Sequence, residues 1–244
     1  MNEFFDLPTI IFLGIAIVVL LRLRSVLGTK TGNEKPASKR VYDKDKKAKN
    51  PIANNDDNIV PLHPDNPANE VNIVEEKRAL KLEAQIEKLS HGDEKLAQGF
   101  RDIASVDRDF LPKNFLEGAK SAYEMIVTAF AQGDKKTLKN LLAKDVYEGF
   151  EAVISQREAA GQSVDFTFVG LPKVEFASAE LDKRTALVTI KFYAEVVSAT
   201  RDKDGNLIEG NADQIANLAD SWTFARNTKT SDPNWKLVAT DQLD

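Results

Sequence analysis

The 244-residue chain is 42% hydrophobic, which is enough for one sizeable folded domain with extensions. Cysteine is absent, which excludes disulfides, thiolate metal sites and a cysteine nucleophile. Residues 1–50 carry ten Lys and Arg against five Asp and Glu, a net charge of +5. The rest of the chain carries 23 Lys and Arg against 33 Asp and Glu, a net charge of −10, so the total of −5 hides a basic N-terminal part and an acidic remainder. An acidic domain is a poor match for phosphates, and nucleic acid is not an expected partner.

An apolar run at residues 7–21 predicts a membrane-embedded helix within an anchor that spans residues 1–28. The run is shorter than the about 20 residues that a span needs, but Arg22 and Arg24 can reach the interface with their long side chains. A cleaved signal peptide is the alternative, yet Glu3 and Asp6 precede the run where a signal peptide carries positive charge. The positive-inside rule places the N-terminus outside and the rest in the cytoplasm. The expected membrane-spanning residues are Leu7, Ile10, Ile11, Phe12, Leu13, Ile15, Ile17, Val18, Val19, Leu20 and Leu21.

Residues 29–70 are expected to be a disordered tether, because they are rich in Lys, Asn, Asp and Pro and hold few large apolar residues. The basic stretch at residues 39–49 suggests contact with anionic lipid head groups, worth about 1 kcal/mol for each basic residue held near the surface. The equally weighted alternative is a solvated tether whose charge only fixes topology. The candidate head-group residues are Arg22, Arg24, Lys44, Lys46, Lys47 and Lys49.

Amphipathic helices are predicted over residues 71–107. In the first, at residues 73–89, apolar residues recur every three or four positions and the charges cancel. A lipid-binding helix is usually enriched in Lys and Arg, so we favour a coiled-coil-like or partner-binding helix over a lipid-binding one. The second helix is expected at residues 94–106, with Leu96 and Phe100 on its apolar side.

Three further helices are expected before the strands begin. Pro112 suits the first turn of a long helix, and Gly133 can serve as its left-handed cap. Asp134 and Asp145 are the predicted N-caps of two shorter helices, and Gly161 is expected to end the second.

After the helices, apolar residues recur at every second position, which predicts β-strands. The first three strands are expected at residues 164–168, 174–176 and 184–200, with a hairpin turn at 181–184. The third is well beyond the usual length, so it is expected to bend across the sheet. A polar turn is expected over residues 202–213.

The last hairpin, at residues 220–241, holds both tryptophans. Trp222 and Phe224 share one face of the first arm, and Trp235 and Leu237 share one face of the second. An isolated hairpin is marginal in water, so other strands and a helical layer must bury these rings. The fold class predicted for the folded part is α+β, with a helical layer packed on a curved antiparallel sheet.

Two stretches resemble the Tim-forty-four-like (Tim44-like) domain family. The Asp-x-Trp-x-Phe-x-Arg pattern from Asp220, followed by Asn-Trp-Lys-Leu-Val from Asn234, is similar to its C-terminal signature. The sequence FLEGAKSAYEMIVTAFAQGDKKTLKNLLAKDVYEGF at residues 115–150 extends the resemblance, and residues 108–244 are assigned as the Tim44-like domain. The apolar N-terminus resembles the bacterial, membrane-anchored branch. The family's fold is similar to the nuclear-transport-factor-two-like and cystatin-like class, in which helices cover a concave sheet and leave a pocket.

The resemblance implies a membrane-anchored adaptor or scaffold that docks protein partners at the cytoplasmic face of a bacterial inner membrane, linked to protein translocation or membrane-protein quality control. The implied partners are membrane lipids, including anionic ones, and proteins such as a chaperone or a translocase component. The helices at the start of the domain inherit a lipid-binding hypothesis from the mitochondrial relatives. The alternative function is a carrier or receptor for a lipid or other apolar ligand bound in the domain pocket.

Catalysis is not predicted, and neither a cofactor nor a metal is expected. His63 and His91 fall in the tether and in a turn between helices. Residues 202–213 begin like a calcium loop, but Leu207 and Asp213 stand where the Gly and the bidentate Glu belong, so a polar turn is favoured.

Paired acids such as Asp165 and Asp220 are candidates to face a pocket, although nothing in the sequence positions them there. The candidate core residues, with a role in contacting a ligand as the alternative, are Tyr123, Phe130, Phe150, Phe166, Phe192, Trp222 and Phe224.

Overall fold

The computed structural model describes residues 67–230 and 232–243. The predicted membrane helix at residues 7–21, the candidate lipid contacts Arg22, Arg24 and residues 44–49, and most of the predicted tether lie outside the described residues. Within the described part of the chain, no helix is both long enough and apolar enough to cross a bilayer.

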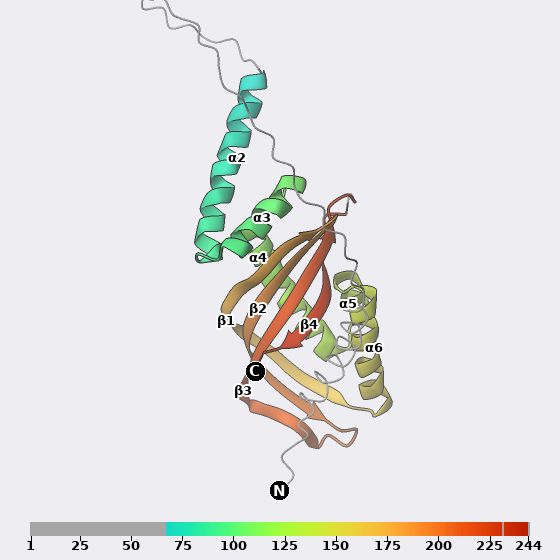
Figure 1. Ribbon diagram of the computed structural model, residues 1–244. Coiled ribbons are helices and arrows are strands. Elements are labelled where there is room, and N and C mark those ends of the chain that lie inside the picture. The colour runs from blue at the N-terminus through green and yellow to red at the C-terminus, as the bar shows by residue number, and fades with distance from the viewer. Residues whose placement is uncertain (1–66, 231, 244) are drawn as a thin grey trace, which may run out of the picture.

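Helix α2 (Pro67–Ser90) starts earlier than predicted, so residues 67–70 are helical and are not part of a tether. Proline is favoured in the first turn of a helix, where its missing N–H costs nothing. Ile86 near the C-terminal end of α2 is buried, whereas Val74 and Leu80 are exposed. The helix projects beyond the rest of the folded part (Figure 1).

Helix α3 (Glu94–Val106) has the predicted bounds, and the Asp93 side chain caps it by accepting from the N–H of Leu96 at 3.0 Å. This helix packs on the first strand of the sheet at Gly99. A Cβ built on Gly99 would lie only 1.9 Å from the carbonyl oxygen of Ala179. The missing side chain is therefore what allows this close approach.

Helix α4 (Pro112–Gln132) is the long helix that crosses the sheet, and Gly133 ends it in the left-handed region at φ 72° as predicted. Helix α5 (Lys135–Leu141) follows at once. Asp134 caps it by accepting from the N–H of Thr137 at 3.0 Å. The Thr137 hydroxyl also donates to Asp134 at 2.6 Å, and this bond first, then the one from the N–H, lowers the pKa of Asp134. Both local signals in the sequence are confirmed.

The prediction that Asp145 caps the next helix is wrong. Helix α6 (Lys144–Ala159) begins two residues earlier than predicted, and Ala143 stands at its N-cap without a side-chain bond. The N–H of Ala143 donates to the carbonyl of Leu237 on the last strand at 2.8 Å. A tertiary contact thus sets the start of α6, which local capping chemistry does not reveal.

The sheet contains four antiparallel strands in the order β1-β2-β3-β4: β1 (Ser163–Asp182), β2 (Thr185–Arg201), β3 (Leu207–Asn227) and β4 (Lys236–Gln242). The predicted strands at residues 164–168 and 174–176 are one strand, β1. Its register with β2 shifts on both sides of Gly170, close to Pro172, and this breaks the alternation. Because β1 lies at the edge of the sheet, it tolerates the proline and the bulges.

Strand β3 begins well before the predicted hairpin arm. The polar turn is limited to residues 202–206, where the Asp202 carboxylate accepts from the N–H groups of Asp204 and Asn206 at 2.9 Å each. From Leu207 on, the chain pairs with β2 through a bulged register. Pairing with β2 therefore overrides the low strand propensity of this polar stretch.

The core lies between α4 and the inner face of the sheet. Tyr123 of α4, Phe192 of β2 and Trp222 of β3 are all at most 3% exposed. The Tyr123 ring lies 4.4 Å from that of Trp222 and 4.6 Å from that of Phe192, between centroids. The predicted fold class of helices on a curved antiparallel sheet is confirmed.

Candidate functional site

A buried pair of ionisable residues lies in the centre of the core. The Tyr123 hydroxyl donates to Oδ2 of Asp220 at 2.6 Å, and both residues are fully or almost fully buried. Burial raises the pKa of Asp220 to about 6, although the bond from Tyr123 acts in the opposite direction. Burial, and then the charge of Asp220, raise the pKa of Tyr123 above its ordinary value. Asp165, the other acid of interest, lies on the exposed side of β1 in an ion pair with Arg201.

Neither Tyr123 nor Asp220 lines either of the two cavities described below. The pair is therefore closed off from both cavities by the aromatic core around it. A general acid or base must come within hydrogen-bond reach of its substrate. Asp220 is therefore not among the groups that a ligand in either cavity would meet.

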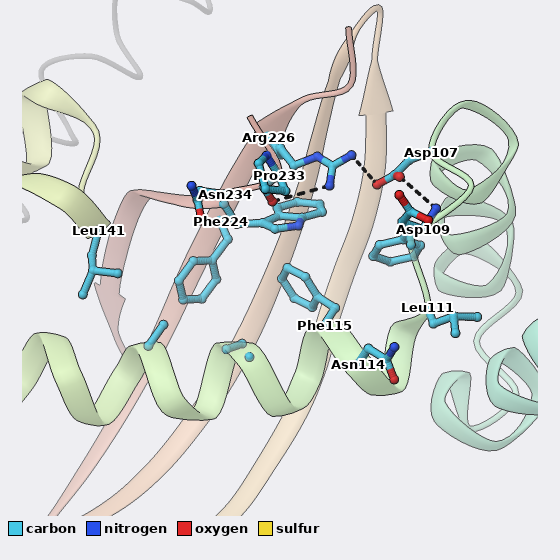
Figure 2. A pocket seen from close by; sticks show the side chains of 15 residues that line it. Asp107, Asp109, Leu111, Asn114, Phe115, Leu141, Phe224, Arg226, Pro233 and Asn234 are labelled. Carbon is cyan, nitrogen blue, oxygen red and sulfur yellow. Dashed lines mark hydrogen bonds and ion pairs between the residues drawn. The ribbon is translucent and has the colours of Figure 1, made fainter. Parts of the chain in front are cut away.

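The first cavity, which we call the Arg226 pocket, has a volume of about 350 Å³. It lies where the α3–α4 connection, one side of α4, the end of β3 and the β3–β4 loop meet (Figure 2). Three kinds of lining residue matter: aromatic rings, small residues of α4, and an ion pair. The aromatic rings are Phe110, Phe115, Phe224 and Trp235, the small residues are Gly118, Ala119 and Ala122, and the ion pair is formed by Asp107 and Arg226.

The ion pair of this pocket is almost completely removed from solvent. Nη2 of Arg226 lies 2.7 Å from Oδ2 of Asp107, and the two side chains are 14% and 4% exposed. The contact is an ion pair without the geometry of a hydrogen bond, and the Nε–H of Arg226 is buried with no hydrogen-bond partner. Nη1 reaches the carbonyl of Pro233 at the long distance of 3.5 Å. Within the described residues, the hydrogen-bonding capacity of Arg226 is thus only partly used.

The aromatic side of the Arg226 pocket is rigid because its rings pack on one another. The Phe115 ring lies 4.6 Å from that of Trp235 in an edge-to-face arrangement and 6.1 Å from that of Phe224. The guanidinium of Arg226 lies 5.9 Å from the Trp235 ring. These contacts join α4 to both arms of the last hairpin and hold the ion pair in place.

The second cavity, which we call the apolar cavity, has a volume of about 370 Å³. It lies at the other end of the sheet, where β1 begins, β2 ends and the first part of β3 runs past the end of α4. Its walls include Phe130 and Val127 of α4, Phe166 of β1 and the exposed Ile215 of β3.

One charged side chain stands out in the wall of the apolar cavity. Arg157 of α6 donates from Nη2 to the carbonyl of Phe130, and its guanidinium lies 4.6 Å from the centroid of the Phe130 ring. Burial lowers the pKa of Arg157. Glu209 also lines the cavity, and its charge acts against the effect of burial on Arg157. The cavity therefore combines apolar walls with two opposite charges at one place.

The seven aromatic residues singled out in the sequence separate into two groups. Tyr123, Phe150, Phe192, Trp222 and Phe224 are buried, and Phe224 also borders the Arg226 pocket. Phe130 and Phe166 are partly buried and line the apolar cavity.

No role was predicted from the sequence for Arg226 or Asp107. A signal for Arg226 was present, since it follows Trp222 and Phe224 at a spacing of two and so faces the core. A charge on that face needs a buried partner. Nothing in the sequence identified Asp107 as that partner, because it stands in a loop between two helices.

A metal site finds no support in the described residues, where no group of three or more His, Cys, Asp or Glu side chains is placed to hold a cation. In the stretch that begins like a calcium loop, the carboxylate of Asp202 is engaged with its own turn. Those bonds also lower the pKa of Asp202.

The fold and the last hairpin define a class of protein, an α+β domain with helices on a curved four-stranded sheet. A family model described as the Tim44-like domain matches residues 96–242, which is most of the described chain. The chain belongs to the Tim44-like domain family.

Relatives with this domain include translocase subunits and a bacterial protein. The chain is 22% identical over 148 residues to mitochondrial import inner membrane translocase subunit TIM44-1 of Arabidopsis thaliana, covering 58% of this chain and 31% of that protein. It is 21% identical over 146 residues to mitochondrial import inner membrane translocase subunit TIM44 of Homo sapiens, and the match covers 59% of this chain and 32% of that protein. An uncharacterized protein of Rickettsia prowazekii is 25% identical over 142 residues, 58% of each chain. The match therefore spans about a third of the length of these mitochondrial proteins.

Solved structures give weaker matches. The intermembrane space region of the chloroplast protein ARC6 has a TM-score of 0.39 and 13% identity, covering 52% of this chain and 95% of that one. An NTF2-like protein from Cytophaga hutchinsonii has a TM-score of 0.30 and 13% identity, and the match covers 52% of this chain and 97% of that one.

Proposed function

We propose that this protein is a non-enzymatic, membrane-anchored adaptor that docks protein partners at the cytoplasmic face of a bacterial inner membrane. The observation that carries the proposal is the family match, which extends over nearly all of the folded part. Relatives that share this domain are subunits of a translocase, so a role in protein translocation or in membrane-protein quality control follows by kinship. A chaperone or a translocase component is the kind of partner we expect.

The membrane attachment in this proposal rests on the sequence. Residues 7–21 would form the membrane helix, and Arg22 and Arg24 would mark its cytoplasmic end. The lysines at residues 44–49 would contact anionic head groups, at a gain of about 1 kcal/mol for each. The protein should therefore remain with membranes after an alkaline carbonate wash, and release by salt alone would contradict the anchor.

The buried acid in the core supports a docking role over a catalytic one. Asp220 is a buried acid with a raised pKa, yet it lines neither cavity. The two cavities described above and the exposed apolar residues of α2, such as Val74 and Leu80, are features suited to binding.

The apolar cavity favours a second candidate function, a carrier or receptor for a lipid or another apolar ligand. Its volume of about 370 Å³ falls within the usual range of ligand sites, about 300–1,000 Å³. Phe130, Phe166 and Ile215 supply apolar walls in this cavity. A carrier would retain one ligand per chain through purification.

Crosslinking of the full-length chain in native membranes, followed by identification of both proteins and lipids, separates the two functions. The adaptor proposal expects a reproducible protein partner and no stoichiometric lipid. A stoichiometric lipid without any protein partner would reject the adaptor and favour the carrier.

A further inference from the structure

We propose that α2 pairs with the α2 of a second copy of this chain, as a short, parallel, two-stranded coiled coil. The pairing uses the outer seam of α2, which we define as Ile73, Lys77, Leu80, Ala84 and Glu87. This inference goes beyond the adaptor function proposed above, because it assigns an interface between copies of the chain and does not depend on which other protein the chain docks.

The outer seam lies on the side of α2 that faces away from its own domain. Ile86 is buried, and Leu82 and Leu89 pack against the core beside it. Leu80 stands two positions before Leu82, which is about 200° around a helix, so it points to the opposite side. Leu80 is 66% exposed, and Ile73, seven positions earlier on the same face, is 50% exposed. α2 can therefore bind a partner helix without leaving its own domain, from which it projects (Figure 1).

The spacing of the outer seam is that of a coiled coil. Ile73, Leu80 and Glu87 recur every seven residues, and Lys77 and Ala84 follow the first two of them after four residues each. This alternation of four and three is the seam of a heptad repeat, with Ile73 and Leu80 at d positions and the lysine and the alanine at a positions. A single lysine at an a position weakens such a seam but specifies its register and its number of strands.

The charges beside the seam decide the occupant and its direction. Glu76 and Glu83 stand at g positions on one side of the seam, and Lys81 and Lys88 stand at e positions on the other side. In a parallel pair of helices, each g residue contacts the e residue of the partner's following heptad. Glu76 thus meets the partner's Lys81, and Glu83 meets the partner's Lys88 in the same way. An antiparallel pair would bring glutamate to glutamate and lysine to lysine, which is repulsive. The seam is therefore complementary to a parallel copy of itself.

One of these two contacts involves side chains that the domain itself does not use. Glu83 is paired with Arg101 of its own chain at 3.1 Å, although its side chain is still 52% exposed. Glu76 and Lys81 are exposed, and neither forms an ion pair with another residue of the described chain. They are five positions apart on one helix, so they do not face each other within it. The contact of Glu76 with the partner's Lys81 is therefore the sharper one to test.

The parallel direction also fits the place of α2 in the chain. Residues 1–66 precede α2 and contain the predicted membrane helix at residues 7–21. Two anchored copies would present their α2 helices to each other with both N-terminal ends toward the same membrane surface, as parallel pairing requires. A seam of about two heptads binds weakly in dilute solution, and attachment to one surface raises the effective concentration. This step alone rests on the proposed anchor.

The test uses single cysteines in the full-length chain, which has no cysteine of its own. Ile73→Cys, Leu80→Cys or Ala84→Cys is introduced, and the cell fraction that carries the chain is oxidised with copper phenanthroline. Each cysteine should form a disulfide with the same residue of the partner, because a and d side chains face their equivalents across a parallel seam. Ala79→Cys is the control, since Ala79 is exposed but outside the seam. The seam variants should crosslink about tenfold faster than this control or more.

Two comparisons identify the direction of the pair. Residues 73 and 84 are about 16 Å apart along a helix, and in an antiparallel pair only one point of the seam can face itself, so crosslinks at both positions identify parallel pairing. In the Leu80→Cys chain, Glu76→Lys should lower the rate of crosslinking about fivefold, because it places like charges together in both symmetric contacts. Adding Lys81→Glu should restore the rate. Glu124→Lys, the same change of charge at an exposed position of α4, should leave the rate unchanged.

The proposal is overturned if the seam cysteines crosslink no faster than Ala79→Cys, if only one seam position crosslinks, or if Lys81→Glu does not rescue Glu76→Lys. If the seam cysteines form no disulfide but lipid shields them from a water-soluble maleimide, the outer seam lies on the membrane surface and the pairing is wrong. If the crosslinks form as expected and no other protein is captured in membranes, the pairing stands and the adaptor function fails.

Discussion

The buried Asp220 gives the domain a defined pH dependence, and Asp220→Asn tests it. The pKa of Asp220 in the folded protein is about 6, raised from an ordinary 3.8. Because the folded pKa is raised, the ionised form is disfavoured in the folded state. The resulting loss of stability is complete above pH 6 and disappears as the pH falls below about 4. A shift of about two units corresponds to about 3 kcal/mol.

Asparagine removes the charge and keeps an oxygen that accepts from the Tyr123 hydroxyl. Asp220→Asn should therefore be more stable than the wild type at pH 8, by at most about 3 kcal/mol, because its buried amide N–H groups gain no certain partner. The advantage should vanish at pH 4. Urea unfolding between pH 4 and pH 8, followed by near-ultraviolet circular dichroism, measures the difference. Asp165→Asn, which removes an exposed carboxylate, is the control and should change stability by about 1 kcal/mol or less.

A constant difference between wild type and Asp220→Asn across this pH range would refute the reasoning. So would a variant that is less stable than the wild type at pH 8, because the bond from Tyr123 would then outweigh the cost of burying the charge.

Three further substitutions test the packing. Trp222→Ala should cost about 3 to 5 kcal/mol, because Trp222 is 3% exposed and its loss leaves a cavity in the core. Thermal melting checks this, and a mild shift would mean that solvent already reaches the ring. Tyr123→Phe removes the hydrogen bond that the Tyr123 hydroxyl donates to Asp220 and should cost about 1 to 3 kcal/mol at pH 8. Unfolding at pH 4 and pH 8 should show a smaller cost at the lower pH, and a larger cost there would contradict the account. Gly99→Ala would place a Cβ 1.9 Å from the carbonyl oxygen of Ala179, so α3 must shift from β1. Hydrogen exchange of α3 should rise, and unchanged protection would show that the backbone adapts without loss.

The local signals in the sequence predicted the helices better than the strands. Gly133 and Asp134 act at helix ends through contacts within a few residues, and these are visible in the sequence. The start of α6 is different, because the bond from Ala143 to Leu237 depends on the finished sheet. Capping chemistry near the helix cannot show such a contact.

The strands were misjudged where pairing overrides propensity. Gly170 and Pro172 interrupt the alternation of apolar and polar residues, so β1 is predicted as two strands. In the structure β1 is one strand, because bulges allow it to stay paired with β2 on both sides of the interruption. Gly210 has a similar role in β3. It adopts φ 74°, and a Cβ there would lie 2.1 Å from the carbonyl oxygen of Ser198. Bulges of this kind bend a sheet, and only the partner strand reveals them.

The candidate site was predictable in part. Alternation along β3 puts Trp222, Phe224 and Arg226 on one face, and that pattern indicates a buried cation. The position of Asp107 depends on how α3 and α4 meet over the sheet. The burial of the Arg226 Nε without a hydrogen-bond partner has the same origin, so it emerges only from the fold.

The central claim is that the protein is a membrane-anchored adaptor, and quantitative crosslinking in native membranes tests it most directly. The full-length chain is compared with a chain that lacks residues 1–28, expressed at the same level. The account predicts that the full-length chain crosslinks reproducibly to the same protein partner, and that the yield falls sharply without the anchor. It would be contradicted if the full-length chain yielded no protein partner, and most clearly if it carried one lipid per chain instead.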